Sequence, residues 1–239
     1  MKNNKTSLLL SIVAVLALIV MVMSGVQIIN TRAALSPATA VYRGEIELDH
    51  LDVTLMENHK AVDGTLLNDL KDIDPGKEYK EVISVKNDSD VDEYVRLVIR
   101  KYWSDTSEKR VTLDPELIVL SYSGKDYNDN AWVENKAEAT TERKVYYLRK
   151  ILPGETESED LFDTIMINDE IMDKYEITTT KEGNSTITRL VYEYDGYYIN
   201  LEAEVQSIQQ AEADSAAASV WGNTGVSIDT ASQTVKVGE

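Results

Sequence analysis

The 239-residue chain contains no cysteine, only two histidines, four prolines and a single phenylalanine. The absence of cysteine excludes thiol catalysis, thiolate metal sites and disulfide-linked polymers. It does not exclude a stable fold, because a chain of this length buries a sizeable core without disulfides.

Recognisable catalytic motifs are also absent. The sequence has no His-Glu-x-x-His, no Gly-x-Ser-x-Gly, no Walker loop and no dinucleotide-binding fingerprint. His50 and His59 are nine residues apart, so on one regular strand they would face opposite ways. The stretch 126–130 has part of the spacing of a calcium loop but lacks its glycine and its distal glutamate. We predict no enzymatic activity, no metal ligands and no cofactor, with both histidines solvated.

Basic residues are scarce. The chain has 24 Lys and Arg against 42 Asp and Glu, a net charge of −18. Residues 1–33 hold three basic residues and no acidic ones, so without them the net charge becomes −21. This balance argues against nucleic acid as a partner, because phosphate neutralisation needs Lys and Arg. Copies of the chain repel each other at long range, so self-assembly needs specific contacts or counter-ions.

The N-terminus has the layout of an export signal. After Lys2 and Lys5 no charge occurs from Thr6 to Thr31, and Leu8–Ile29 is almost wholly apolar. A basic start, an apolar stretch and then small residues are typical of a secretory signal peptide. At 22 residues the apolar run is also long enough to span a bilayer. Cleavage and retention as an anchor are therefore both open.

Small residues suited to a signal peptidase precede Ala33 and Ala40, which we take as the cleavage region. We predict that residues 1–33 are a signal peptide, or an anchor if uncleaved. The general secretory route would then place the chain outside the cell or at the cell surface, with the N-terminal apolar segment as its only membrane contact. An exported chain without cysteine fits a Gram-positive bacterial surface.

Beyond the N-terminus, short runs of alternating apolar and polar residues are separated by turn residues. We expect a hairpin between 186–194 and 197–208, joined at Asp195-Gly196. A short helix should follow at Gln209–Val220 and stop near Gly222. The other expected strands lie near 45–55, 79–85, 93–103, 117–122, 145–152, 161–168, 225–228 and 234–237.

Many short strands without a long amphipathic helix predict an all-β fold. We expect an antiparallel β-sandwich, jelly-roll-like, with one or two short helices, formed by a single domain over residues 45–239. Tyrosine is frequent, with 13 residues. Tyrosines on strands stabilise sheets through cross-strand pairs, or form a surface for carbohydrate or a partner; the predicted strands carry Tyr146, Tyr147, Tyr192, Tyr194, Tyr197 and Tyr198.

Several local patterns together resemble one family. They are the Leu70–Lys77 turn, the strand ends at Val85–Ser89 and Glu93–Leu97, the Leu152–Thr156 turn, and the stretches Leu201–Gln206 and Ala216–Gly222. The chain resembles the TasA/camelysin (CalY)-like proteins of Gram-positive bacteria, including biofilm-matrix proteins of the BsaA type. Export of that family depends on a SipW-type signal peptidase, which the resemblance implies as a partner here.

The resemblance implies a secreted structural subunit of extracellular fibres in a biofilm matrix, with other copies of the chain as its partner. In that family an N-terminal segment freed by cleavage completes the sheet of the next subunit by strand addition. Here the segment is 34–48, with Val41, Ile46 and Leu48 as the residues that fill pockets. The aromatic stretch that often follows the family's signal is missing, and Ala40–Gly44 stands in its place.

Two alternatives remain beside the fibre subunit. One is a surface-binding module held in the membrane by an uncleaved Leu8–Ile29 segment. The other is a secreted camelysin-like metallopeptidase, since camelysin relatives are described as metallopeptidases. That alternative would depend on His50 and His59, and the sequence shows no recognisable metal triad for it.

Overall fold

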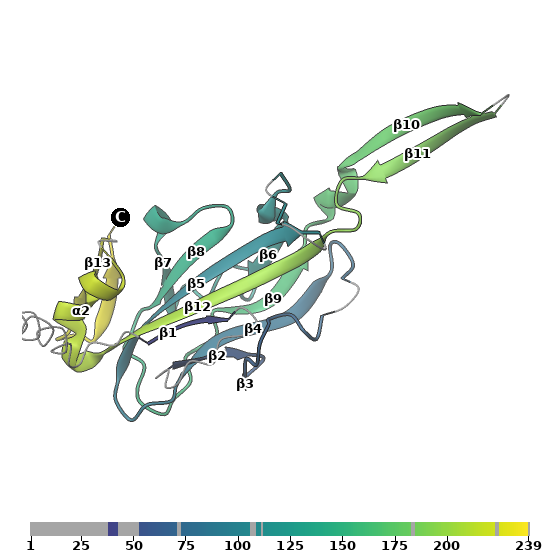
Figure 1. Ribbon diagram of the computed structural model, residues 1–239. Coiled ribbons are helices and arrows are strands. Elements are labelled where there is room, and N and C mark those ends of the chain that lie inside the picture. The colour runs from purple at the N-terminus through teal and green to yellow at the C-terminus, as the bar shows by residue number, and fades with distance from the viewer. Residues whose placement is uncertain are drawn as a thin grey trace, which may run out of the picture. The chain divides into compact units, whose positions relative to one another are not determined.

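Two antiparallel five-stranded sheets pack face to face in the part of the chain that the computed structural model describes (Figure 1). The described residues are 38–42, 53–70, 73–105, 109–110, 112–182, 185–222 and 225–238. Sheet A has the order β1 (Ala38–Tyr42), β12 (Tyr198–Gln209), β5 (Glu93–Ser104), β8 (Arg143–Leu148), β7 (Trp132–Glu134). Sheet B has the order β3 (Lys60–Ala61), β2 (Val53–Glu57), β4 (Glu78–Asn87), β9 (Phe162–Ile167), β6 (Ile118–Ser121).

Two smaller hairpins and several short helical elements accompany the large sheets. The hairpins are β10 (Tyr175–Glu182) with β11 (Ser185–Tyr192), and β13 (Val226–Asp229) with β14 (Thr234–Val237). The described α-helix is α2 (Ala213–Val220). The 3-10 turns are η2 (Pro115–Leu117), η3 (Lys136–Glu138), η4 (Asp169–Asp173) and η5 (Gln210–Glu212).

The main core lies between the two sheets. On β5 the residues Val95, Leu97 and Ile99 are buried, as their period of two predicts. They belong to the same cluster as Ile83 and Val85 of β4 in the opposite sheet. The prediction of an antiparallel β-sandwich with a short helix is thereby confirmed, while the jelly-roll strand order stays a prediction.

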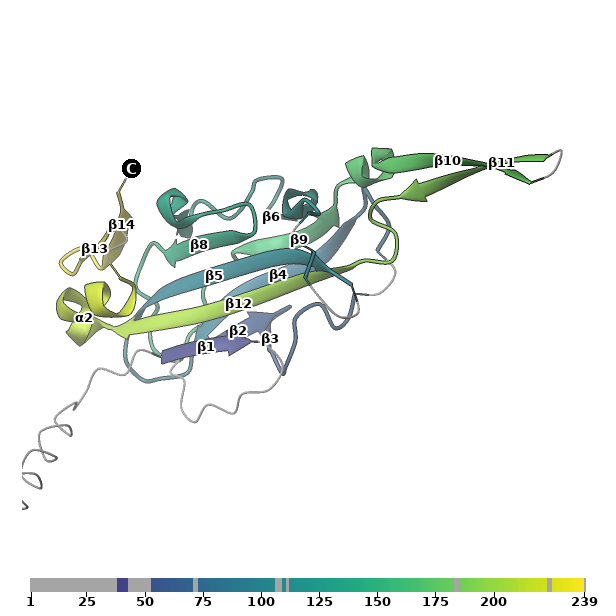
Figure 2. The same ribbon diagram turned by 45° about the horizontal axis from the view of Figure 1, so that its top comes forward.

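A second, smaller cluster lies on the other face of sheet A. Tyr94 and Val98 of β5 are buried there, next to Tyr147 of β8. The Trp221 ring packs edge-on against Tyr147, with 5.0 Å between ring centroids. Trp221 follows α2, so the predicted C-terminal helix is present and covers this end of the sheet (Figure 2). Glycine suits the position after it, because Gly222 has φ +79.

The hairpin expected between 186–194 and 197–208 is wrong. β11 pairs with β10, from Tyr175 opposite Tyr192 to Glu182 opposite Ser185. β12 instead pairs with β5 through all twelve of its residues. The expected turn at Asp195-Gly196 exists, with Gly196 at φ +80, but it links strands of different sheets.

Burial explains this outcome. Pairing with β5 places Leu201, Ala203 and Val205 of β12 in the main core, whereas the described side chains of β10 and β11 are exposed. A hairpin signal was present in the sequence: Gly183-Asn184 is a two-residue connection of a favoured kind. The signal was missed because the polar, threonine-rich sequence of β10 lacks the apolar alternation expected of a strand.

A β-bulge on strand β4 of sheet B contains a buried carboxyl group. The pairing of β4 with β9 shifts register between Lys80 and Ile83, and Glu81 inside this shift is buried. Burial, together with the hydrogen bond and charge of Glu57, raises the pKa of Glu81 to about 9. Glu81 is therefore protonated in the folded protein at neutral pH.

Replacing Glu81 by Gln should stabilise the protein at pH 8. The unfolded carboxyl titrates near 4.5 and the folded one near 9, so folding takes up a proton between these values. The contribution of the Glu81 carboxyl to the unfolding free energy therefore falls as pH rises from about 4.5 to about 9. We compare the unfolding free energy of Glu81→Gln with that of the parent by urea titration. The difference, variant minus parent, should be larger at pH 8 than at pH 5 by more than about 1.4 kcal/mol. Glu78→Gln, at the exposed start of the same strand, is the control, and an equal gain at both pH values would contradict the assignment.

The β10–β11 hairpin should be dispensable for folding of the sandwich. Its strands pair with each other, and its ends are adjacent because Glu193 N–H donates to the Lys174 carbonyl at 2.8 Å. Joining Lys174 to Glu193 through two glycines should change Tm by less than about 4 °C in a calorimetric scan. Deleting 226–237 instead should lower Tm more, because Val235 is buried in the second cluster. An unfolded hairpin deletion would show that the hairpin is part of the folding unit.

Candidate functional site

Strand β1 forms one edge of sheet A and falls within the segment 34–48 that the sequence predicts as a donor strand (Figures 1 and 2). It pairs antiparallel with β12, from Ala38 opposite Ser207 to Tyr42 opposite Ala203. Two residues named from the sequence lie in it: Ala40 opposite Val205 and Val41 opposite Glu204. Ala33, Ile46 and Leu48 lie outside the described residues, as do the signal-peptide region 1–33 and its apolar run.

The two partners in this edge pairing differ in charge. Residues 34–44 contain one charged residue, Arg43, and no acid. The strand they meet carries Glu202 and Glu204. The pairing therefore adds an uncharged strand to an acidic one, which avoids repulsion between like charges at this joint.

The acids of β12 are engaged by side chains of the neighbouring strand β5. Tyr102 donates its hydroxyl proton to Glu202 Oε1 at 2.7 Å. Arg100 lies 3.4 Å from Glu204 Oε2. These contacts hold the carboxylates on the outer face of sheet A, where they flank the β1 edge.

Arg96 is the most enclosed charge on this face. Its Nη1 donates to Gln206 at 2.8 Å and its Nη2 to Glu138 of η3 at 2.7 Å. The side chains of Arg96 and Glu138 are only 7% and 16% exposed. Tyr147 also donates to Glu138, at 3.1 Å. This network attaches β12 to β5 and to η3, and thereby fixes the strand on which β1 pairs.

The inner face of β12 is apolar. Leu201, Ala203 and Val205 pack in the main core with Val53 and Leu55 of β2. The edge strand thus lies beside a β12 backbone that is fixed from both faces, by core packing on one and by the Arg96 network on the other.

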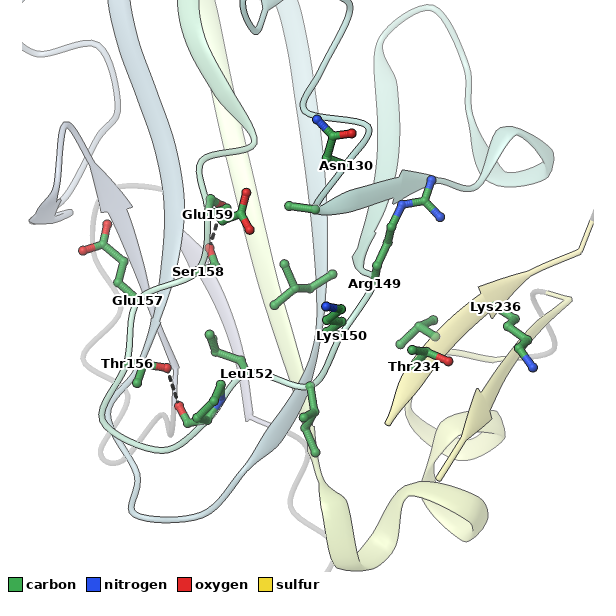
Figure 3. A pocket seen from close by; sticks show the side chains of 15 residues that line it. Asn130, Arg149, Lys150, Leu152, Thr156, Glu157, Ser158, Glu159, Thr234 and Lys236 are labelled. Atoms are coloured by element: carbon green, nitrogen blue, oxygen red, sulfur yellow. Dashed lines mark hydrogen bonds between the residues drawn. The ribbon is translucent and has the colours of Figure 1, made fainter. Parts of the chain in front are cut away.

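An open groove of about 540 Å³ lies where the end of β8 meets β14 (Figure 3). Its floor is partly apolar, with Leu152 and Val235, and its rim carries both signs of charge. Arg149 donates to the Asp129 carbonyl at 3.0 Å and Lys236 pairs with Asp229 at 2.8 Å. Two of the three cations in the lining, Arg149 and Lys236, are thus already engaged, and Lys150 is the third. Together with Glu157 and Glu159 they give a mixed lining that selects no ligand charge.

A second groove, of about 470 Å³, lies near the start of β12, and three of the tyrosines named from the sequence line it: Tyr194, Tyr197 and Tyr198. Tyr194 is buried in its wall, its ring edge-on to Trp103 with 4.9 Å between centroids. Tyr198 is 58% exposed. Tyr146 and Tyr147 lie in the two cores. The two interpretations of the tyrosines thus apply to different residues: most stabilise packing, and Tyr192 and Tyr198 present exposed rings.

The histidines and the calcium-like loop have different surroundings. His50 lies outside the described residues, and His59 lies in the turn between β2 and β3 beside Glu157 and Asp160. No sequence motif links these three residues. In the loop 126–130, the buried Asn128 donates to the Asp160 carbonyl at 3.0 Å, so this residue holds the loop against the segment that precedes β9.

Comparison of the chain with models of known families, with curated proteins and with solved structures finds no match. Within the described ranges, no helix is both long and apolar enough to cross a membrane. The β1 edge is therefore the feature of the molecule on which a function can be proposed.

Removing the Arg96 guanidinium should destabilise the fold markedly. Arg96→Ala leaves Glu138 enclosed without its closest cation, and we expect a loss of about 3 kcal/mol in the unfolding free energy from urea titration. Lys125→Ala, which breaks the exposed pair with Asp129, should leave the urea midpoint unchanged. Equal effects of the two substitutions would contradict the role given to the network.

Proposed function

We propose that the chain is an exported structural subunit of extracellular fibres in a biofilm matrix, assembling by strand addition between copies. In the fibre, β1 of one subunit occupies the edge of β12 in the next. The observation that carries this proposal is the position of β1: residues 38–42 of the segment predicted as a donor form a short edge strand paired with a single neighbour, β12.

Short edge strands are suited to exchange. Five residues pair β1 to β12, so opening this contact breaks few backbone hydrogen bonds compared with unfolding a sheet. The same backbone bonds form again when β1 of another copy takes the place, as in domain swapping. The acceptor does not need to rearrange, because β12 is held by β5 along its whole length.

The distribution of charge also favours a contact between β1 of one subunit and β12 of the next. A subunit with a net charge of −21 repels its neighbours, and a joint made by its acidic surface would be opposed. Strand β1, the part of the segment that pairs with β12, carries no charge, and Glu45 and Glu47 of the segment follow it in the sequence. The paired residues therefore bring main-chain hydrogen bonds without adding repulsion. Main-chain bonds of this kind supply affinity in strand addition.

The route to the cell exterior follows from the N-terminal pattern. We propose export by the general secretory route with removal of residues 1–33 by a signal peptidase of the SipW type. Removal leaves Ala34 as the first residue and frees the segment that contains β1. An anchored chain would keep this segment close to the membrane and limit its exchange.

Deleting residues 34–48 from the full chain should abolish fibres and leave a folded, secreted monomer. The deletion removes the donor and keeps the sandwich strands from β2 onward. Negative-stain microscopy of the culture medium and sedimentation of the purified protein measure the outcome. Filaments that persist in a folded deletion variant would overturn strand addition by this segment.

A point substitution tests whether fibres require the pairing of β1 itself, without shortening the chain as the deletion does. Ala40→Pro places a proline in the middle of β1, which a paired strand tolerates poorly, and should reduce fibres strongly. Ser36→Pro, ahead of the strand and away from the proposed cleavage bond, is the matched control. Mass spectrometry of each secreted protein verifies that the N-terminus is the same, since Ala40 is also a candidate cleavage position.

A further inference from the structure

Three side chains with metal-binding atoms meet on the outer side of sheet B. They are His59, from the turn that follows β2, and Glu157 and Asp160, from the segment that precedes β9. His59 Nδ1 lies 2.9 Å from Glu157 Oε1 and 3.9 Å from Asp160 Oδ1. All three ligand atoms lie within 4.8 Å of one another.

These separations match a shared ion. Imidazole nitrogen and carboxylate oxygen bind Zn²⁺ at about 2.0–2.2 Å in tetrahedral geometry, which sets neighbouring ligand atoms roughly 3.4 Å apart. The two His59 distances lie on either side of this value. Small side-chain rotations would therefore bring the three atoms around one centre.

The Glu157 carboxylate is oriented by a contact that does not involve the ion. Ser84 of β4 hydrogen-bonds to Glu157 Oε1, the kind of outer contact that orients metal ligands. The main chain around Glu157 is paired to β4, since Ser158 N–H donates to the Val85 carbonyl at 2.8 Å. Glu157 also borders the groove beside β14, and Figure 3 shows its carboxylate directed away from β14.

The local electrostatics favour a cation. Glu157 and Asp163 both add negative charge near Asp160. Asp163 Oδ1 is shielded from solvent and has no hydrogen-bond partner among the described residues. Lys80 and Lys86 oppose this field from β4, but Lys86 is paired with Asp88.

We propose that His59, Glu157 and Asp160 bind one divalent transition-metal ion, with Zn²⁺ as the ion whose ligand preferences they match. One imidazole and two carboxylates favour Zn²⁺ over Ca²⁺ or Mg²⁺, which take oxygen ligands. The side chains are 53%, 30% and 26% exposed, so water completes the coordination.

The ion acts as a cross-link within sheet B. β4 pairs with β2 on one side, and on the other side with β9 and the segment before it. His59 follows β2 and Glu157 lies in that segment, so the ion connects the two neighbours of β4 across its face. The inference is independent of the proposed function, because it concerns the outer side of sheet B and not the β1 edge.

The test is isothermal titration of the chelator-treated protein with Zn²⁺ alone, together with thermal unfolding at increasing Zn²⁺. We expect one ion per chain and a Tm that rises with Zn²⁺ concentration, because the ion binds the folded state. His59→Gln and Glu157→Gln should each weaken binding more than about tenfold, and Ser84→Ala by about tenfold.

Matched controls come from the same chain. His50→Gln removes the other histidine, and Glu159→Gln removes an acid two residues from Glu157; both should bind Zn²⁺ as the parent does. Ca²⁺ and Mg²⁺ should not produce a shift that depends on His59. Parent binding without a defined stoichiometry, or binding unaffected by His59→Gln, would overturn the proposal.

Discussion

The pairing of β12 with β5 is the interaction on which the rest of the structure depends. Twelve residues of each strand lie opposite one another, from Tyr198 and Ser104 to Gln209 and Glu93. One face of this ladder enters the main core, and the other supports the cluster beneath α2. The β1 edge exists because β12 is fixed from its far side. The β10–β11 hairpin leads into one end of the same strand, and α2 follows its other end.

Much of this arrangement could be predicted from residues alone, because most strands carry their own burial pattern. The alternation of Val95, Leu97 and Ile99 identified β5 and its core face, and the Ala-rich stretch before Gly222 identified α2. The partner of β12 could not be read in this way. Asp195-Gly196 is a strong local turn. Local turn chemistry does not reveal that burying Leu201 and Val205 requires a strand a hundred or more positions earlier.

The candidate sites show the same limit. The donor segment was predicted by resemblance, and the position of β1 at the sheet edge agrees with the place such a segment would need. The Arg96 network and the His59 cluster were not predicted, because each combines residues far apart in the chain. His59 and Glu157 are 98 positions apart, and only the pairing of sheet B brings them together. The sequence around His59 does not indicate that Glu157 and Asp160 lie beside it in the fold.

The proposed strand addition would also account for association of so acidic a chain. Long-range repulsion keeps subunits apart, and a short joint made of main-chain hydrogen bonds is weakened little by it. On the acidic acceptor strand, Glu204 is paired with Arg100, and Glu202 accepts a hydrogen bond from Tyr102. In the proposed fibre, assembly would depend on access to β12 more than on the general surface. Access would be set by whether β1 pairs with β12 of its own subunit, as in the structure, or with that of the next.

The most direct test uses the absence of cysteine in the chain. Val41 and Glu204 are register partners, and partners in an antiparallel pair lie at a separation that a disulfide spans. Two single variants, Val41→Cys and Glu204→Cys, are mixed under assembly conditions, oxidised and analysed by mass spectrometry. The account predicts a mixed disulfide between the two proteins, and polymer ladders when both cysteines are on one chain. A double variant that yields only an internal disulfide, with no mixed product from the single variants, would contradict exchange of β1 between subunits.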